Sequence, residues 1–75
     1  MIYTDKVHLV ADNLFELHSF AKTVGLKRFY FHGVRKSHPH YDITNNIMLN
    51  KVLEQPNVQV VSSKIILIKS KNLLK

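Results

Sequence analysis

The stretch Asn13-Leu-Phe-Glu-Leu-His-Ser-Phe-Ala-Lys-Thr-Val-Gly25 carries the strongest structural signal in the chain. Its apolar residues recur at intervals of three and four, which predicts a helix over residues 13–24 with one buried face. Asn13 can cap this helix in a capping box with Glu16, and Asp12 is the rival cap. Gly25 supplies the left-handed residue at which such a helix ends. The predicted buried face consists of Leu14, Leu17, Phe20, Ala21 and Val24.

Two segments outside this helix have the pattern of strands. Residues 2–4, Ile-Tyr-Thr, form a short run of β-branched and aromatic residues. In residues 28–32, Phe29 and Phe31 alternate with Arg28, Tyr30 and His32, which is typical of a strand that is buried on one side. The polar residues 33–40 that follow predict a loop.

A second helix is expected from about Thr44 or Asn45 to Gln55. Thr44 or Asp42 would cap it, and Pro56 would end it, because proline cannot donate the next backbone hydrogen bond. Its predicted buried stripe consists of Met48, Leu49, Val52 and Leu53.

The C-terminal third is less clear. Residues 58–61 are a strand by composition. Residues 65–68 also have strand propensity, but the apolar spacing behind a cap at Ser62 or Ser63 favours a helix, which we prefer. The resulting β-α-β-α-β-α order predicts a small α/β domain over residues 1–75. We expect a three-stranded sheet with parallel strands and right-handed crossovers, on which the helices pack.

Composition narrows the class of protein. The chain of 75 residues is 45% hydrophobic, enough for one small globular domain. It contains no cysteine, which excludes disulfides and thiolate metal sites. Its apolar runs fall far short of the roughly 20 residues that span a membrane, and its first residues lack the pattern of a signal peptide. We therefore expect a cytoplasmic protein. No pattern in the sequence indicates the oligomeric state.

The net charge of +6 is unevenly distributed. Residues 1–26 carry two lysines against three acids, residues 27–42 four cations against one acid, and residues 43–75 five lysines against one acid. This excess predicts an anionic partner such as a nucleotide, a nucleic acid or an acidic protein surface. The alternative is that the lysines only keep the chain in solution.

Side chains able to do chemistry gather in two places, residues 8–18 and residues 38–42. The sequence has no phosphate-binding glycine loop, nucleophile elbow or H-E-x-x-H pattern. We predict His18, His40 and Asp42 as catalytic residues, because imidazoles and carboxylates serve as general acids and bases. The ligand-binding candidates are His8, Asp12, Tyr41, Arg28, Arg35 and Lys36, the three cations holding an anionic group. Each of these residues also has a structural interpretation, as a helix cap or a hydrogen-bonded boundary residue.

His38, His40 and Asp42 offer imidazole and carboxylate ligands on a loop stiffened by Pro39, so they are the candidates for a divalent metal. An H-x-H pair near an aspartate arises often by chance. A metal is therefore a weaker expectation than the pocket.

Four segments resemble a known family: H-L-V-A-D at 8–12, E-L-H-S-F-A at 16–21, G-L-K-R at 25–28 and H-P-H-Y-D at 38–42. They are similar to an uncharacterised family of short bacterial and phage proteins, catalogued as domain of unknown function four thousand and thirty-one. The resemblance brings no established activity, but its signature is rich in acids and imidazoles and so implies a polar site. The matching positions here are Tyr3, Asp5, His8, Asp12, Glu16, His18, Phe20, Gly25, His40, Tyr41 and Asp42.

Two departures from the family pattern stand out. Only Lys6 and Val7 separate Asp5 from His8, where the resemblance implies several more residues. Pro56-Asn57 stands where relatives tend to have Gly-Ala. A shortened loop near the predicted site implies a reduced or altered activity.

The sequence is compatible with three functions. The leading one is a small phage or bacterial protein whose His/Asp/Tyr pocket binds an anionic small molecule such as a nucleotide. If it is an enzyme, hydrolysis, with or without a metal, suits these side chains. The alternatives are an interaction protein without an active site that binds a host macromolecule, and a nucleic-acid-binding module that uses residues 27–36 weakly and without sequence preference.

Overall fold

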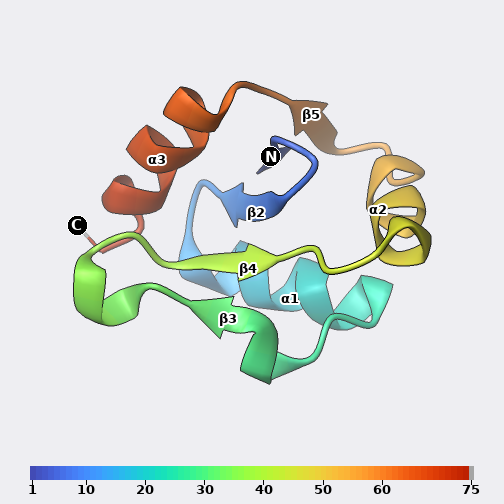
Figure 1. Ribbon diagram of the computed structural model, residues 1–75, viewed down its shortest axis with the longest axis horizontal. Helices are drawn as coiled ribbons and strands as arrows, with labels where there is room; N and C mark the ends of the chain where they lie inside the picture. The colour runs from blue at the N-terminus through green and yellow to red at the C-terminus, as the bar shows by residue number, and fades with distance from the viewer. Residues whose placement is uncertain (75) are drawn as a thin grey trace.

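The computed structural model describes residues 1–74, and in that range the strands form one five-stranded sheet of order β3-β4-β2-β1-β5 (Figure 1). Adjacent strands are antiparallel except for β1 and β5, which are parallel. The α/β class is confirmed, but the prediction of a three-stranded parallel sheet is wrong. The strands are β1 (Ile2–Thr4), β2 (His8–Ala11), β3 (Phe31–His32), β4 (His40–Asp42) and β5 (Val58–Val60).

The two strands missing from the prediction, β2 and β4, lie at the centre of the sheet. Residues 5–7 are too few for a crossover, so β2 must return antiparallel beside β1. The β4 strand then pairs with β2 on one side and with β3 on the other. Among the described strands, only β1 and β5 pair in parallel, and residues 5–57 separate them in the chain.

The helices are those expected, α1 (Leu14–Val24), α2 (Asn46–Leu53) and α3 (Ser63–Asn72). The Asn13 side chain caps α1 by accepting from the Glu16 N–H at 2.8 Å, and Gly25 ends it at φ +86°. Asn45 caps α2, so the prediction of Thr44 or Asp42 is wrong. Ser62 caps α3, which confirms the preferred helix. None of the helices in residues 1–74 is long and apolar enough to cross a membrane.

The predicted strand over residues 28–32 is mostly a tight turn. Residues 28–30 form a 3-10 helix, in which the Tyr30 N–H donates to the Lys27 carbonyl at 3.0 Å. Only Phe31 and His32 join the sheet, as β3. The Phe29 side chain is 65% exposed, so the alternation of aromatic residues did not reflect burial. The predicted loop over residues 33–40 contains a further 3-10 turn and the first residue of β4.

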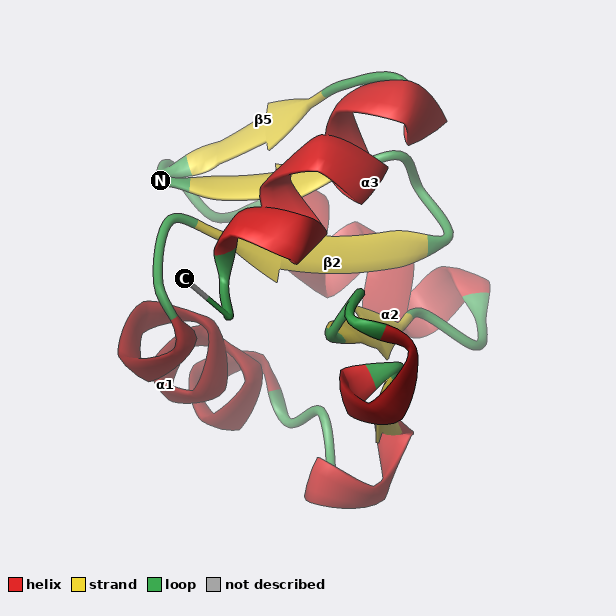
Figure 2. Cartoon of the chain, turned by 90° about the vertical axis from the view of Figure 1, so that its left-hand side faces the viewer, coloured by secondary structure: helices red, strands yellow, loops and turns green. Residues whose placement is uncertain are grey.

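The sheet has two different faces. Leu9 and Tyr41 are cross-strand partners, and both are buried on the face covered by α1. Neighbouring residues point to the opposite face, because side chains alternate along a strand. That second face carries His8 and His40, and α3 lies across it (Figure 2).

Gly33 closes the connection from β3 to β4. Its φ is +88°, and its carbonyl accepts from the Lys36 and His38 N–H groups, each at 3.0 Å. A Cβ at this position would lie 2.3 Å from the His38 carbonyl oxygen, whereas a Cβ at Gly25 would meet nothing within 4 Å. Gly33 is therefore needed for close backbone approach as well as for its conformation.

We expect Gly25→Ala to lower the free energy of unfolding by about 1 kcal/mol, the cost of the left-handed conformation. Gly33→Ala adds a backbone clash and should cost about 2–4 kcal/mol in total. Urea denaturation of both variants measures the difference. Equal losses would mean that the 33–38 turn opens at no cost and does not hold β4 in place.

Candidate functional site

Four polar side chains share one face of the sheet. His8 pairs with Asp42 across β2 and β4, and His32 pairs with His40 across β3 and β4. Cross-strand partners point to the same face, as do residues two apart on one strand. His40 and Asp42 are two apart, so all four lie on one face of the sheet, and His8 and His40 line a cavity against α3.

The Asp42 carboxylate is the centre of this cluster. Its Oδ1 lies 3.1 Å from His40 Nε2, and its Oδ2 lies 3.2 Å from His32 Nε2. His8, His40 and Asp42 each offer a ligand atom, and these three atoms lie within 4.8 Å of one another. The rings of His8 and His40 meet edge to face with centroids 5.0 Å apart. The cluster is half-buried: 15% of the His40 side chain and 37% of the His8 side chain are exposed.

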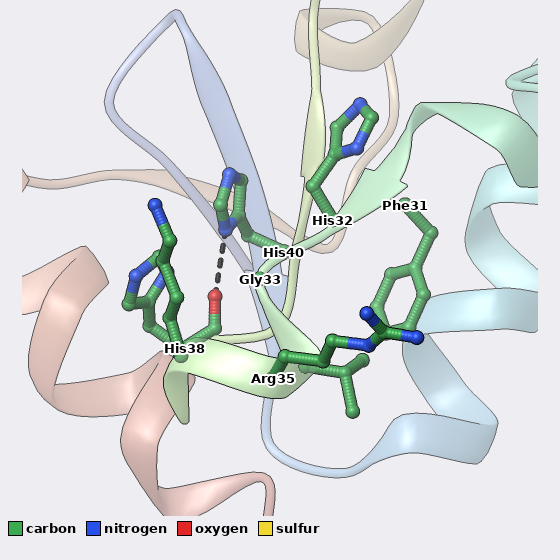
Figure 3. A pocket seen from close by; sticks show the side chains of 8 residues that line it. Phe31, His32, Gly33, Arg35, His38 and His40 are labelled. Atoms are coloured by element: carbon green, nitrogen blue, oxygen red, sulfur yellow. Dashed lines mark hydrogen bonds between the residues drawn. The ribbon is translucent and has the colours of Figure 1, made fainter.

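Hydrogen bonds orient two of the imidazoles. His40 Nδ1 lies 2.7 Å from the His38 carbonyl oxygen, and a carbonyl only accepts, so this nitrogen carries a hydrogen (Figure 3). His8 Nδ1 lies 3.0 Å from the Asp5 carboxylate and donates to it in the same way. In both rings, Nε2 is the nitrogen left to accept a proton or bind a ligand.

Asp5 supports the cluster from the turn between β1 and β2. Its carboxylate accepts from the Val7 and His8 N–H groups at 3.0 and 2.7 Å, and from the Ser63 hydroxyl at 2.8 Å. Only 5% of its side chain is exposed. Burial alone would raise the pKa of Asp5, but the hydrogen bonds from His8, Ser63 and Val7 outweigh burial and hold that pKa well below its usual range. Asp5 is therefore a buried carboxylate that stays ionised.

Two cavities adjoin the cluster, one on each side of His38 and His40. The larger, of about 430 Å³, lies against the β3–β4 connection (Figure 3). Its walls are Phe31, His32, Gly33, Val34, Arg35, Lys36, His38 and His40. The smaller, of about 220 Å³, lies between β2 and α3 and is lined by His8, His38, His40, Ser63, Ile66, Leu67 and Ser70.

His18 and Tyr41 lie on the opposite face of the sheet. His18 Nδ1 is 2.7 Å from the Tyr41 hydroxyl, and both line a separate pocket of about 290 Å³ with Arg28. Burial, followed by the positive charge of Arg28, lowers the pKa of His18. Burial raises the pKa of Tyr41, and the charge of Arg28 opposes that rise. These three residues form a unit of their own.

Asp12 lies apart from both of these groups, near the start of α1. It accepts a hydrogen bond from the Tyr3 hydroxyl at 3.0 Å and contacts Lys69 Nζ at 3.5 Å. The Met1 amino group lies 3.3 Å from Asp12 and 2.7 Å from Glu16. Asp12 is thus part of an ion-pair network at the start of α1.

The residues predicted to share one pocket are therefore divided. His8, His40 and Asp42 come together, and Arg35 and Lys36 line the adjoining cavity. The four that lie elsewhere are Asp12, His18, Arg28 and Tyr41. The metal group predicted from the sequence was His38, His40 and Asp42, but the structure brings His8 rather than His38 to His40 and Asp42. The backbone carbonyl of His38 instead accepts the hydrogen bond from His40 Nδ1.

The sequence interpretation included Asp5 only among the positions that match the family signature, and it gave His32 no place in the predicted pocket. The signal for Asp5 was present, because an aspartate just before a two-residue turn readily accepts backbone N–H groups. His32 has no comparable signal, because its position follows from the β3–β4 register alone.

We expect Asp5→Asn to lower the free energy of unfolding at pH 7 by about 1–3 kcal/mol, because the donors of Val7, His8 and Ser63 lose their charged acceptor. A carboxyl with a depressed pKa in the folded state adds stability above the unfolded pKa of about 4, and this is lost as the pH falls below that value. The gap between wild type and variant should therefore shrink below about pH 4.

Urea denaturation from pH 7 down to about pH 3 measures this gap. The exposed Glu54→Gln is the matched control and should change stability by less than about 0.5 kcal/mol. A gap for Asp5→Asn that stays constant over the whole range would contradict an ionised Asp5.

The comparisons with known proteins agree with the resemblance in the sequence. The model of one family, described as protein of unknown function (DUF4031), matches residues 4–72. No curated protein and no solved structure matches the chain. The matched range includes Asp5, His8, His40 and Asp42, so the half-buried polar cluster lies within the matched part of the chain. The chain is a member of the DUF4031 family.

Proposed function

We propose that this domain binds a phosphate-bearing small molecule, such as a nucleotide, in the cavity against the β3–β4 connection. The observation that supports this proposal is the lining of that cavity. Arg35 and Lys36 share it with the imidazoles of His32, His38 and His40. Among the described residues, none of those that line it is acidic. Five groups that carry or can acquire positive charge therefore face one space.

The shape of the cavity suits such a ligand. Its volume of about 430 Å³ falls within the range of roughly 300–1,000 Å³ typical of small-molecule sites. The Arg35 guanidinium can pair with two phosphate oxygens at once, and Lys36 adds a point charge. Phe31 and Val34 supply an apolar wall against which a base or sugar can pack.

The neighbouring cluster supports hydrolysis as the reaction. Because Nδ1 of His40 donates to the His38 carbonyl, a neutral His40 ring carries its lone pair on Nε2. A neutral imidazole next to a carboxylate can take a proton from water that attacks a phosphoryl group. His40 lines the phosphate cavity and also contacts Asp42, so the proposed base stands at the edge of the proposed binding site. The Asp42 carboxylate would stabilise the imidazolium that forms.

We expect calorimetric titration to show binding of ATP and pyrophosphate, and none of adenosine, which lacks phosphate. Removing both cations of the cavity in Arg35→Ala/Lys36→Ala should weaken binding at least about tenfold. The matched control is Lys51→Ala/Lys64→Ala, which removes the same charge from exposed positions outside the cavity. Equal weakening by the two double variants would mean that net charge, rather than this cavity, attracts the anion.

Nucleic acid is the competing partner. The same wild-type protein should bind duplex and single-stranded oligonucleotides weakly, through Lys27, Arg28, Arg35 and Lys36, and lose them as salt is raised toward physiological strength. Tight binding that persists at high salt, or that discriminates between sequences, would overturn the small-molecule proposal in favour of a nucleic-acid-binding module.

A further inference from the structure

We infer that His8, His40 and Asp42 bind one divalent transition-metal ion at the face of the sheet beneath α3. The first observation is their convergence. The pairing of β2 with β4 brings the two imidazoles and the carboxylate together, with one ligand atom from each within a span of 4.8 Å. A bound ion at about 2.1 Å from each ligand needs them about 3–3.5 Å apart, so small side-chain rotations complete the site.

The second observation is a pair of acceptors that face each other. His40 Nδ1 already donates to the His38 carbonyl, so in the neutral ring Nε2 presents a lone pair. That lone pair lies 3.1 Å from Oδ1 of the Asp42 carboxylate, which also only accepts. Two acceptors at this distance need a cation between or beside them. Either a proton or a metal ion can fill that role, and the position of His8 favours the metal.

His8 adds a second imidazole, which one shared proton would not require. Its Nδ1 donates to Asp5, so its Nε2 is the free nitrogen, as in His40. Metal-binding histidines usually donate their other ring nitrogen to a carboxylate or a backbone carbonyl. Both arrangements occur here, the carboxylate of Asp5 for His8 and the carbonyl of His38 for His40. The outer hydrogen bonds of a metal site are therefore already in place.

The ligand types indicate the kind of ion. Two imidazoles and one carboxylate suit Zn²⁺, Fe²⁺ or Co²⁺ better than Mg²⁺ or Ca²⁺, which prefer oxygen. Three protein ligands leave one or more positions for water or substrate, as in catalytic rather than structural sites. His32 contacts the second oxygen of Asp42 at 3.2 Å and would hold that carboxylate in place.

Metal binding stands on this geometry alone, and only its role in hydrolysis rests on the proposed function. His40 belongs both to the metal group and to the wall of the cavity that contains Arg35 and Lys36. An anion held there would lie next to the ion. With Nε2 of His40 bound to the ion, His40 could no longer act as the base. The ion would activate water in its place, by lowering the pKa of a bound water molecule, and would polarise a phosphoryl oxygen.

The test is calorimetric titration of chelator-treated, tag-free protein with Zn²⁺ and Co²⁺ in the absence of any phosphate ligand. We expect one ion per chain and a visible Co²⁺ absorption band typical of nitrogen and oxygen ligands. His8→Gln, His40→Gln and Asp42→Asn should each weaken binding more than about 100-fold, because each removes a ligand. Asp5→Asn should weaken it by about 10–100-fold, the effect typical of losing an outer hydrogen bond.

His18→Gln is the matched control, because His18 is also half-buried and hydrogen-bonded but lies on the other face of the sheet. It should leave the affinity and stoichiometry unchanged. Wild-type protein that binds neither ion would overturn the inference, as would an affinity that falls equally in His18→Gln and His40→Gln. Because the ion is titrated alone, failure of ATP to bind would leave this result standing.

A second measurement covers variants that fail to fold. In the wild-type protein, ¹⁵N spectra of the imidazole rings should show Zn²⁺ shifting the Nε2 signals of His8 and His40 and leaving those of His18 in place. Shifts confined to other histidines would overturn the assignment of the ligands.

Discussion

The carboxylate of Asp5 joins three parts of the molecule that lie apart in the sequence. It closes the turn between β1 and β2 by accepting backbone N–H groups, and it receives the hydroxyl of Ser63 at the start of α3. The same group orients the His8 ring. Without its charge these donors would lose their strongest acceptor, a cost of about 1–3 kcal/mol in total. The position of α3, the return of β2 and the direction of His8 thus depend on one ionised side chain.

The short segment H-P-H-Y-D shows how a strand assigns neighbouring residues to different tasks. His40 and Asp42 point to the face of the sheet that carries His8, whereas Tyr41 between them is buried and contacts His18 of α1. A shift of one residue in the pairing of β4 would exchange the two sets and place imidazole and carboxylate in the core. The burial of Tyr41 against Leu9 and Phe31 therefore fixes the register, and the register brings His8 and His32 to the polar cluster.

The sequence allowed the three helices to be predicted, because each has a local apolar pattern about two to three turns long and a capping side chain at its start. The sheet was predicted poorly because its central strands β2 and β4 are only four and three residues long. The strand His40–Asp42 has three residues, too few for alternation to stand out from a loop. The segment 28–32 misled for the opposite reason, since its alternation matched a strand while the chain turned at residues 28–30.

The same limits applied to the candidate site. His8, His40 and Asp42 could be chosen by residue type, but their meeting depends on pairing between strands far apart in the chain. His18 has the same chemistry and was placed with them, because residue type does not report which face of a sheet a side chain occupies. Asp5 could have been recognised from its place before a tight turn, although its contact with Ser63 depends on the tertiary structure.

The polar cluster on the face of the sheet that α3 covers lowers the stability of the domain, and the fold does not require it. A domain of this size has few places for a core, and the face of a central sheet under a helix is one of them. Here that face carries imidazoles, and a cavity of about 220 Å³ remains between β2 and α3. Leu67 and Ile68 of α3 stay 45% and 48% exposed. Apolar residues at these sheet positions would bury more surface at about 25 cal/mol per Å². Sites at which polar residues lower stability in this way are typically functional. Activity needs such polar groups, whereas selection for stability alone would favour apolar residues there.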